Sequence, residues 1–219
     1  MKFDVPIKTT PEQLWKALSE APEITKWYAP EARVVPGQGG SIWLSWGAGC
    51  EGEAKIEVWE PGKCLRTAAP MAVEYSILSE NGQVILRLVQ SGFSPDANFE
   101  EEYQSTFAGW TTMFKALQHS LERHPGTSAV TVSVAGPSGL PQLEAFQRIS
   151  ALLPESAVAV EGHPPGYGGF VLQDQNDSYF AVFCEGRKKT AVTLMCVLYG
   201  PARDQADEFK CLLGKMLLQ

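Results

Sequence analysis

In the first 126 residues, two segments with helical patterns enclose a series of short segments with strand patterns. The first helix is predicted to begin at Thr10, because a threonine N-cap, Pro11 at the first helical position and Gln13 three residues on are typical of a capping box. The second covers residues 107–121, where large apolar side chains recur every three or four residues and form one stripe. Such a stripe must be buried, and the strands between the helices are its expected partner.

The segments between the helices favour an antiparallel sheet. The predicted strands are residues 3–8, 41–46, 53–59, 65–68, 73–78 and 84–90. Asn81-Gly82, between the last two, is a strong signal for a two-residue hairpin. Many consecutive strands joined by short turns indicate an antiparallel meander rather than a parallel sheet, and with the helices they predict an α+β fold.

Residues 126–219 differ in composition from the first part of the chain, since all six tryptophans precede them. Alternating and helical patterns in this part predict several strands, a helix over residues 140–153 and a final helix from Pro201. We therefore expect two domains, one of residues 1–125 and a smaller α+β domain of residues 126–219. The final helix has an apolar face that either covers its own domain or pairs with a second copy of the chain, so a homodimer is one alternative.

Composition excludes several classes of function. The net charge is −7 and no basic cluster occurs, which disfavours binding to nucleic acid or to an anionic membrane. No apolar segment is long enough to span a bilayer, and the first residues have no apolar signal core, so we expect a cytoplasmic protein. Five cysteines without a C-x-x-C pair favour reduced thiols. The three histidines lack ligand spacing, and we expect no metal and no cofactor.

Several short motifs resemble one protein superfamily. They are PEQLWKAL at residues 11–18, ITKWYAP at 24–30, PGQGG at 36–40, SGF at 91–93, GW at 109–110 and LERHPG at 121–126. In this order and spacing, residues 1–125 resemble the SRPBCC (START-like, helix-grip) superfamily. The branch they resemble most is that of homologues of the activator of heat-shock-protein-90 ATPase.

This resemblance implies a bent antiparallel sheet gripped by a long C-terminal helix, with a cavity between helix and sheet. Members of the superfamily bind lipids, polyketides or other hydrophobic molecules, and some catalyse reactions in the cavity. The co-chaperone itself has a further N-terminal domain that contacts the chaperone. Only a few residues precede the matching region in this chain, so chaperone activation is not the leading expectation.

Aromatic side chains are the candidate wall of such a cavity. The expected aromatic lining is Trp27, Tyr28, Trp43, Trp46, Phe93, Trp110 and Phe114. Their rings would supply apolar area, and indole N–H or phenol O–H groups could orient a ligand. The alternative is that these rings simply fill the core, because protein interiors are normally close-packed.

Two polar residues complete the candidate site. Tyr75 is expected to reach the cavity, and Arg87 lies in an otherwise apolar strand. An inward-facing Arg87 could bind a ligand carboxylate, whereas an outward-facing one would pair with a surface acid. The leading prediction is non-covalent binding of a small hydrophobic or amphipathic molecule. The alternatives are a protein-interaction or chaperone-related module, and an enzyme that uses polar groups of the same cavity.

Overall fold

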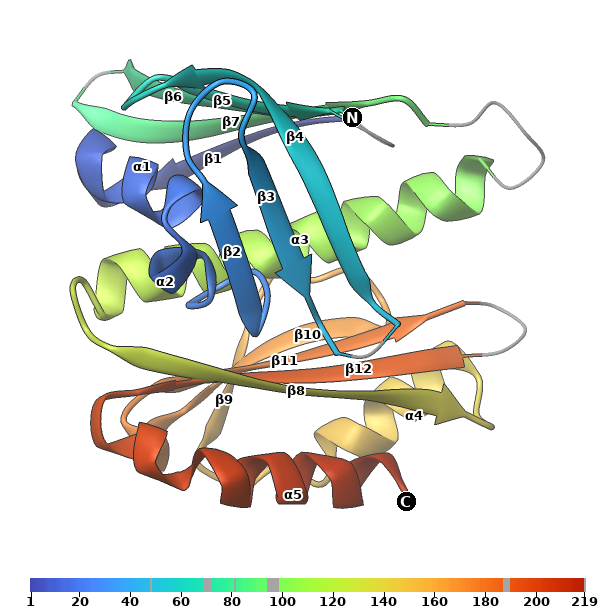
Figure 1. The fold of residues 1–219 in the computed structure, drawn as a ribbon. Helices are drawn as coiled ribbons and strands as arrows, with labels where there is room; N and C mark the ends of the chain where they lie inside the picture. The colour runs from blue at the N-terminus through green and yellow to red at the C-terminus, as the bar shows by residue number, and fades with distance from the viewer. Residues whose placement is uncertain (48, 69–71, 81, 94–98, 187–189, 219) are drawn as a thin grey trace. The chain divides into compact units, whose positions relative to one another are not determined.

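A computed structural model describes residues 1–47, 49–68, 72–80, 82–93, 99–186 and 190–218 (Figure 1). The chain divides into two compact units. Unit 1 contains residues 1–103 and 117–126, and unit 2 contains residues 104–116 and 127–219. One long helix therefore contributes its middle to unit 2 and its two ends to unit 1.

Unit 1 is built on a seven-stranded antiparallel sheet. Its strands are β1 (Lys2–Ile7), β2 (Glu31–Val35), β3 (Ser41–Ser45), β4 (Glu51–Glu60), β5 (Cys64–Ala68), β6 (Ala72–Glu80) and β7 (Gln83–Ser91). Their order in the sheet is β1-β7-β6-β5-β4-β3-β2, which confirms the predicted meander. Glu80 pairs with Gln83 across the β6–β7 hairpin and Gly82 has a φ of 78°, whereas Asn81 lies outside the described residues.

Strand β2 was not predicted. Its sequence, EARVV, alternates between exposed and half-exposed residues, so it carries no strong apolar signal. The strand lies at the edge of the sheet and pairs only with β3, from Glu31↔Ser45 to Val35↔Ser41. Edge strands need less apolar area than central ones, which explains the weak pattern.

Two short helices, α1 (Pro11–Ser19) and α2 (Ala21–Ile24), follow β1. The Thr10 side chain accepts a hydrogen bond from the backbone N–H of Gln13 at 3.2 Å, as the N-cap pattern predicts. The Gln13 side chain, however, accepts from the hydroxyl of Thr9 at 3.0 Å instead of completing the capping box. Leu14 and Leu18 of α1 are buried, so this helix packs one face into the core of unit 1.

The long helix α3 (Phe99–Arg123) is buried on two opposite faces. One face carries the predicted stripe, in which Trp110 and Phe114 are 6% and 3% exposed. The other carries small side chains, among them Ala108 (4% exposed) and Thr112 (0%). At its C-terminal end, Gln118 donates a hydrogen bond to the carbonyl of Pro6 at 2.8 Å, which joins this end of the helix to β1.

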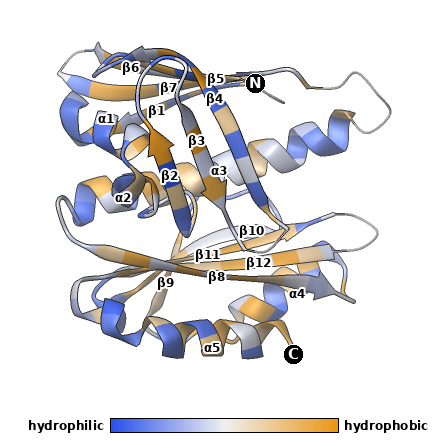
Figure 2. Cartoon of the chain, viewed as in Figure 1, coloured by the Kyte–Doolittle hydropathy of each residue, from blue (hydrophilic) through white to orange (hydrophobic). Residues whose placement is uncertain are grey.

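Unit 2 is built on a second antiparallel sheet. Its elements are β8 (Ala129–Ser138), α4 (Gln142–Ser150), β9 (Ala157–Val160), β10 (Tyr167–Leu172), β11 (Ser178–Glu185), β12 (Thr190–Tyr199), α5 (Ala206–Leu217) and two short 3₁₀ helices, Gln173–Gln175 and Gly200–Gln205. The strand order is β8-β12-β11-β10-β9. Strand β12 is hydrophobic along most of its length (Figure 2). Phe180, Leu194 and Leu198 form a core with Ile149 of α4 and Leu213 of α5.

The opposite face of this sheet contacts the middle of α3. The Ser105 hydroxyl lies 3.4 Å from the Tyr167 hydroxyl and donates to the Glu185 carboxylate, also at 3.4 Å. About two turns further along the helix, Thr112 Oγ1 lies 3.4 Å from Nδ1 of His163. Covered on both faces, β11 is buried at seven of its eight positions.

His163 makes the stability of unit 2 sensitive to acid. Burial, with a smaller effect from the charge of Lys115, lowers the pKa of His163 from 6.5 to about 4. The unfolded chain therefore binds the proton more readily, and the stabilisation present above pH 6.5 is lost as the pH falls toward 4. We expect the melting temperature of the wild-type chain to drop between pH 7.5 and 5, and His163→Gln to drop by roughly 2–4 °C less. If the melting temperatures of the two proteins fall by the same amount across this pH range, the prediction is wrong.

Candidate ligand-binding pocket

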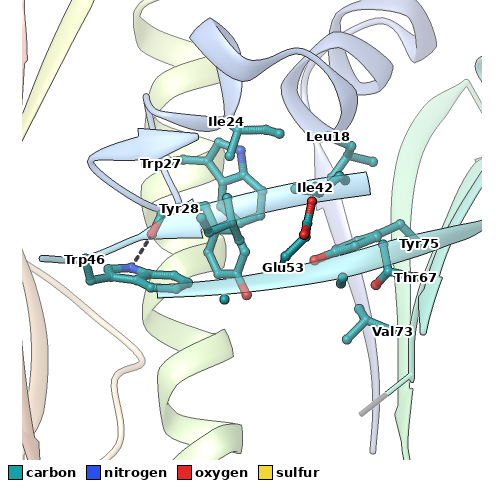
Figure 3. Close-up of a pocket in the computed structure, with 13 residues that line it drawn as sticks. Leu18, Ile24, Trp27, Tyr28, Ile42, Trp46, Glu53, Thr67, Val73 and Tyr75 are labelled. Carbon is teal, nitrogen blue, oxygen red and sulfur yellow. Dashed lines mark hydrogen bonds between the residues drawn. The ribbon is translucent and has the colours of Figure 1, made fainter. Parts of the chain in front are cut away.

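Unit 1 contains a cavity of about 210 Å³ between its short helices and its sheet (Figure 3). The cavity is lined by residues of α1, α2 and the segment after it, β3 and the residue after it, β4, β5 and β6. These residues are Leu18, Ile24, Trp27, Tyr28, Ile42, Leu44, Trp46, Gly52, Glu53, Ala54, Thr67, Val73 and Tyr75. Ile42, Leu44 and Ala54 share the inner face of the sheet, because Ile42 pairs with Ala54 and side chains alternate along each strand.

Three aromatic rings form a continuous wall of this pocket. The rings of Trp27 and Tyr28 stack with centroids 4.9 Å apart, and Tyr28 meets Trp46 edge-on at 5.4 Å. Both indole N–H groups are already used: Trp27 donates to the carbonyl of Ala17 and Trp46 to the carbonyl of Tyr28, each at 2.9 Å. These bonds fix the ring positions and leave neither indole N–H for a ligand.

Polar groups on the wall are hydroxyls. Tyr28 and Tyr75 point their phenol oxygens into the same space, and Thr67 lies beside Tyr75 (Figure 3). Burial raises the pKa of Tyr28 above its ordinary value of 10, and burial together with the nearby Tyr28 raises that of Tyr75. Both phenols are therefore protonated at physiological pH and can donate hydrogen bonds.

Charge is almost absent from the pocket. The lining that the structure describes contains no lysine, arginine or histidine, and its one carboxylate belongs to Glu53. Glu53 is exposed, pairs with Trp43 in the sheet register, and accepts a hydrogen bond from the Ser41 hydroxyl at 2.6 Å. The carboxylate of Glu53 is therefore bound to Ser41. The other side chains of the described lining carry no charge at neutral pH.

Four of the nine sequence-predicted site residues line this pocket, namely Trp27, Tyr28, Trp46 and Tyr75. Four other aromatics lie elsewhere. Trp43 faces the other side of β3, where the guanidinium of Arg33 lies 4.3 Å from its ring centroid. Phe93 packs against Phe99 and Tyr103, with centroids 6.3 and 5.4 Å away. Trp110 and Phe114 stack on each other at 5.4 Å on α3.

The position of the pocket also differs from the expectation. The family resemblance implied a cavity between the sheet and the long helix, but the residues that line this pocket include none from α3. The helices that close it are α1 and α2, through Leu18 and Ile24. The long apolar stripe of α3 is a strong sequence signal. The short helices α1 and α2 contribute only one apolar residue each to the pocket, so they give a much weaker one.

Arg87 is not part of the pocket, and the structure corrects the expectation of an inward-facing carboxylate clamp. Tyr75 pairs with Leu88 in the sheet, so Arg87, next to Leu88, points to the opposite face. There its guanidinium binds both carboxylate oxygens of Asp4, at 2.6 and 3.1 Å, across the β1–β7 pair. The outward-facing alternative describes this residue, with an aspartate as the surface partner.

Substitution of Arg87 is therefore expected to leave the pocket unchanged. Arg87→Leu removes an exposed ion pair, and such pairs contribute little to stability because water and salt screen them. We expect unaltered affinity for any pocket ligand, measured by titration of tryptophan fluorescence, and unaltered ligand selectivity. A selective loss of acidic ligands in this variant would show that Arg87 reaches the ligand after all.

Sequence reasoning missed the aliphatic part of the wall and two of its polar residues. The missed lining residues are Leu18, Ile24, Ile42, Leu44, Gly52, Glu53, Ala54, Thr67 and Val73. The alternation of Ile42 and Leu44 in the strand around Trp43 did carry a signal, because it assigns Trp43 to the opposite face. Aliphatic residues that line a pocket are indistinguishable from core residues without the register of the strands.

Residues 8–122 match the family model described as activator of Hsp90 ATPase homolog 1-like protein. The chain belongs to this family. The match covers α1, α2, strands β2 to β7 and nearly all of α3, and it confirms the resemblance stated from the short motifs. The fold is one that serves hydrophobic-ligand binding or protein interaction, and the match assigns no specific function.

Among solved structures, a protein from Mesorhizobium loti is 24% identical, with a TM-score of 0.51 over 57% of this chain and 97% of that chain. The Aha1 dimer from Colwellia psychrerythraea is 18% identical, with a TM-score of 0.49 over 57% of this chain and 98% of that chain. DynU16, from the dynemicin biosynthetic locus, is 14% identical, with a TM-score of 0.49 over 90% of this chain and 85% of that chain. No curated protein gives a significant match. At these identities the likeness to the Mesorhizobium loti protein supports the helix-grip fold of unit 1.

Other kinds of site find little support in the described parts of the chain. No group of three or more histidine, cysteine, aspartate or glutamate side chains there could hold a metal ion. The same residues include no helix that is both long and apolar enough to cross a bilayer. The five cysteines are free thiols, of which Cys184 and Cys196 are buried in unit 2.

Proposed function

We propose that unit 1 binds a small, mostly apolar molecule in the pocket between α1, α2 and strands β3 to β6. The observation that supports this most directly is a cavity of about 210 Å³ whose aromatic wall is fixed by hydrogen bonds to the backbone. A close-packed core would have no such space, since voids larger than a water molecule are few in proteins. Concave sites with mostly apolar walls favour apolar ligands.

The volume limits the size of the ligand. A cavity of roughly 150 Å³ lined by aliphatic and aromatic side chains holds benzene. Pockets for drug-sized molecules range from about 300 to 1,000 Å³. At about 210 Å³, this pocket fits a molecule of one or two rings rather than a sterol or a long-chain lipid.

Filling the pocket from its β4 wall tests the proposal. Ala54→Leu places three more carbon atoms in the cavity and is expected to weaken binding of one- and two-ring aromatic probes at least tenfold. Ala191→Leu is the matched control, because Ala191 is an exposed strand residue of unit 2. Affinity is measured by quenching of tryptophan fluorescence and by ligand-induced shifts in melting temperature. If no probe of such a panel binds the wild-type chain, or if Ala54→Leu binds as well as the control, the proposal fails.

Native mass spectrometry of the purified chain provides a second test. A small molecule that co-purifies with the wild-type chain and is absent from Ala54→Leu would support the proposal and identify the ligand. A homodimer without a bound small molecule would instead support the protein-interaction alternative.

A further inference from the structure

We infer that the pocket takes an elongated amphipathic molecule, with an apolar ring at the closed end and a chain that leaves over Gly52 and ends in a polar group. This orientation rests on the proposed function, because the ligand lies in the same pocket. Two observations support it: the exposure of the lining residues changes along strands β3 and β4, and a glycine occupies the exposed end.

The pocket is closed at one end and open at the other. Ile42 and Tyr75 are buried, each 8% exposed. Leu44, two residues further along β3, and Trp46 are half-buried, and Gly52, the residue that pairs with Leu44 on β4, is exposed. Trp46 and Tyr75 lie at opposite ends of the lining (Figure 3). Leu44, Trp46 and Gly52 therefore form the mouth of the pocket, where it meets water.

Position 52 is a glycine although the backbone does not require one. The φ of Gly52 is outside the left-handed region, and β4 pairs with β3 without a bulge at this position. A Cβ at Gly52 would meet no atom of the described residues within 4 Å, its chain neighbours aside. Glycine weakens a strand, and it often marks a bulge or the close approach of a ligand or of another backbone. Here no bulge and no close backbone account for it, which leaves the passage of a ligand.

A side chain at position 52 would narrow the mouth. Gly52 and Ala54 lie two residues apart on β4, so they share the face of the strand that lines the pocket. The open space next to Gly52 therefore continues the cavity outward along the strand. A molecule that extends beyond the closed end passes over this glycine.

The size and the polarity of the pocket orient the ligand. At about 210 Å³ the cavity encloses one or two rings, so a longer molecule must extend through the mouth. The closed end includes the buried apolar side chains of Leu18, Ile24 and Ile42. A polar end placed among them would lose its hydration, whereas a polar end at the mouth stays in water. The ring therefore lies inside, and the polar end lies outside.

Two probes with the same ring test the role of the mouth. Toluene supplies only the ring, whereas 6-phenylhexan-1-ol adds a chain with a terminal hydroxyl group. We expect the wild-type chain to bind 6-phenylhexan-1-ol roughly tenfold more tightly than toluene, as burial of about two further methylene groups at the mouth predicts. Affinities are measured by isothermal titration calorimetry.

The substitution Gly52→Val narrows the mouth and leaves the closed end unchanged. We expect it to weaken binding of 6-phenylhexan-1-ol roughly tenfold, because the chain loses its path, while the affinity for toluene stays within twofold of wild type. Gly52→Ala is expected to have an intermediate effect. Unchanged binding of toluene shows that each variant is folded and that its closed end is intact.

Lys55→Val is the matched control on the same strand. Lys55 is exposed and pairs with Ser41, and alternation along β4 places it on the face opposite to Gly52 and Ala54. This variant gains the same valine side chain outside the pocket. We expect it to bind both probes as the wild-type chain does.

The outcomes separate this orientation from the proposed function. If neither probe binds the wild-type chain, the pocket proposal itself fails. If toluene binds the wild-type chain at least as tightly as 6-phenylhexan-1-ol, the pocket stands and the elongated ligand class is wrong. Equal losses of affinity for both probes in Gly52→Val, or no loss for either, would also leave the pocket standing and would contradict a path over Gly52.

Discussion

A fragment of residues 127–219 is expected to remain unfolded at 25 °C, although the sequence predicts it as a domain. In the structure, unit 2 includes residues 104–116 of α3, and this segment contacts one face of the second sheet through Ser105. A fragment of residues 99–219, which retains α3, is expected to regain a cooperative thermal transition. Circular dichroism and the dispersion of amide signals in NMR spectra distinguish the two fragments.

The expected loss is comparable with the whole stability of a domain. The large side chains on the covered face are Tyr179, Phe183, Met195, Val197 and Tyr199, all 5% exposed or less. Burial of each such side chain stabilises the folded state by roughly 1.5–3 kcal/mol, whereas a typical domain is stable by only about 5–15 kcal/mol in total. Removing α3 therefore removes most of the driving force for folding.

A well-dispersed spectrum and a sharp melting transition from residues 127–219 alone would contradict this prediction. The same result would support the boundary after residue 125 that the sequence predicts, which stays a prediction until then. The substitution Thr112→Trp in the full chain provides a milder test of the same contact. It enlarges a fully buried residue on the small-residue face of α3 and is expected to destabilise unit 2 without altering the pocket of unit 1.

Substitution of a single glycine is expected to have the second-largest effect. A Cβ at Gly169 would overlap the hydroxyl of Tyr179, lie 2.6 Å from Cζ of the same ring and lie 2.9 Å from Nε2 of His163. Tyr179 is fully buried, so its ring cannot swing away without displacing the α3 side of the sheet. We expect Gly169→Ala to destabilise the protein by about 3 kcal/mol, at the upper end of typical overpacking costs, which lowers the melting temperature by roughly 6–12 °C.

Two comparisons show whether overlap is the cause. Gly214→Ala introduces the same methyl group on α5, where no atom beyond its chain neighbours and the nearby helix backbone lies within 4 Å, and is expected to be neutral or to stabilise the helix by up to about 1 kcal/mol. Tyr179→Phe, combined with Gly169→Ala, removes one overlapping atom and is expected to restore part of the lost stability. If Gly169→Ala melts at the wild-type temperature, the close packing of Tyr179 on β10 is not a determinant of stability.

The sequence predicted the elements with strong local signals. The Thr10 N-cap, the Asn81-Gly82 hairpin and the stripe of α3 each depend on neighbouring residues, and all three elements form where expected. Short motifs also identified the family correctly, because the match of residues 8–122 covers the same region. Strand β2 was missed because an edge strand needs little apolar periodicity.

The site was harder to predict, because a pocket depends on register and on which elements pack together. Trp43 and Trp46 have the same residue type and lie three positions apart, yet only Trp46 lines the pocket. The long helix was assigned a single buried face because Ala108 and Thr112 carry no strong apolar signal. In the structure both small residues are buried, and Thr112 lies within 3.4 Å of His163 in unit 2. No periodicity rule reveals that a helix is buried on both sides.

The two indole hydrogen bonds of the pocket have a kinetic consequence. They tie the segment after α2 to α1 on one side and to the end of β3 on the other, so the aromatic wall is ordered before any ligand arrives. A preorganised host loses little conformational entropy on association, and it needs no slow rearrangement to accept its guest. We therefore expect rapid exchange of small ligands, with a rate that is limited mainly by their dissociation from the apolar wall of the pocket.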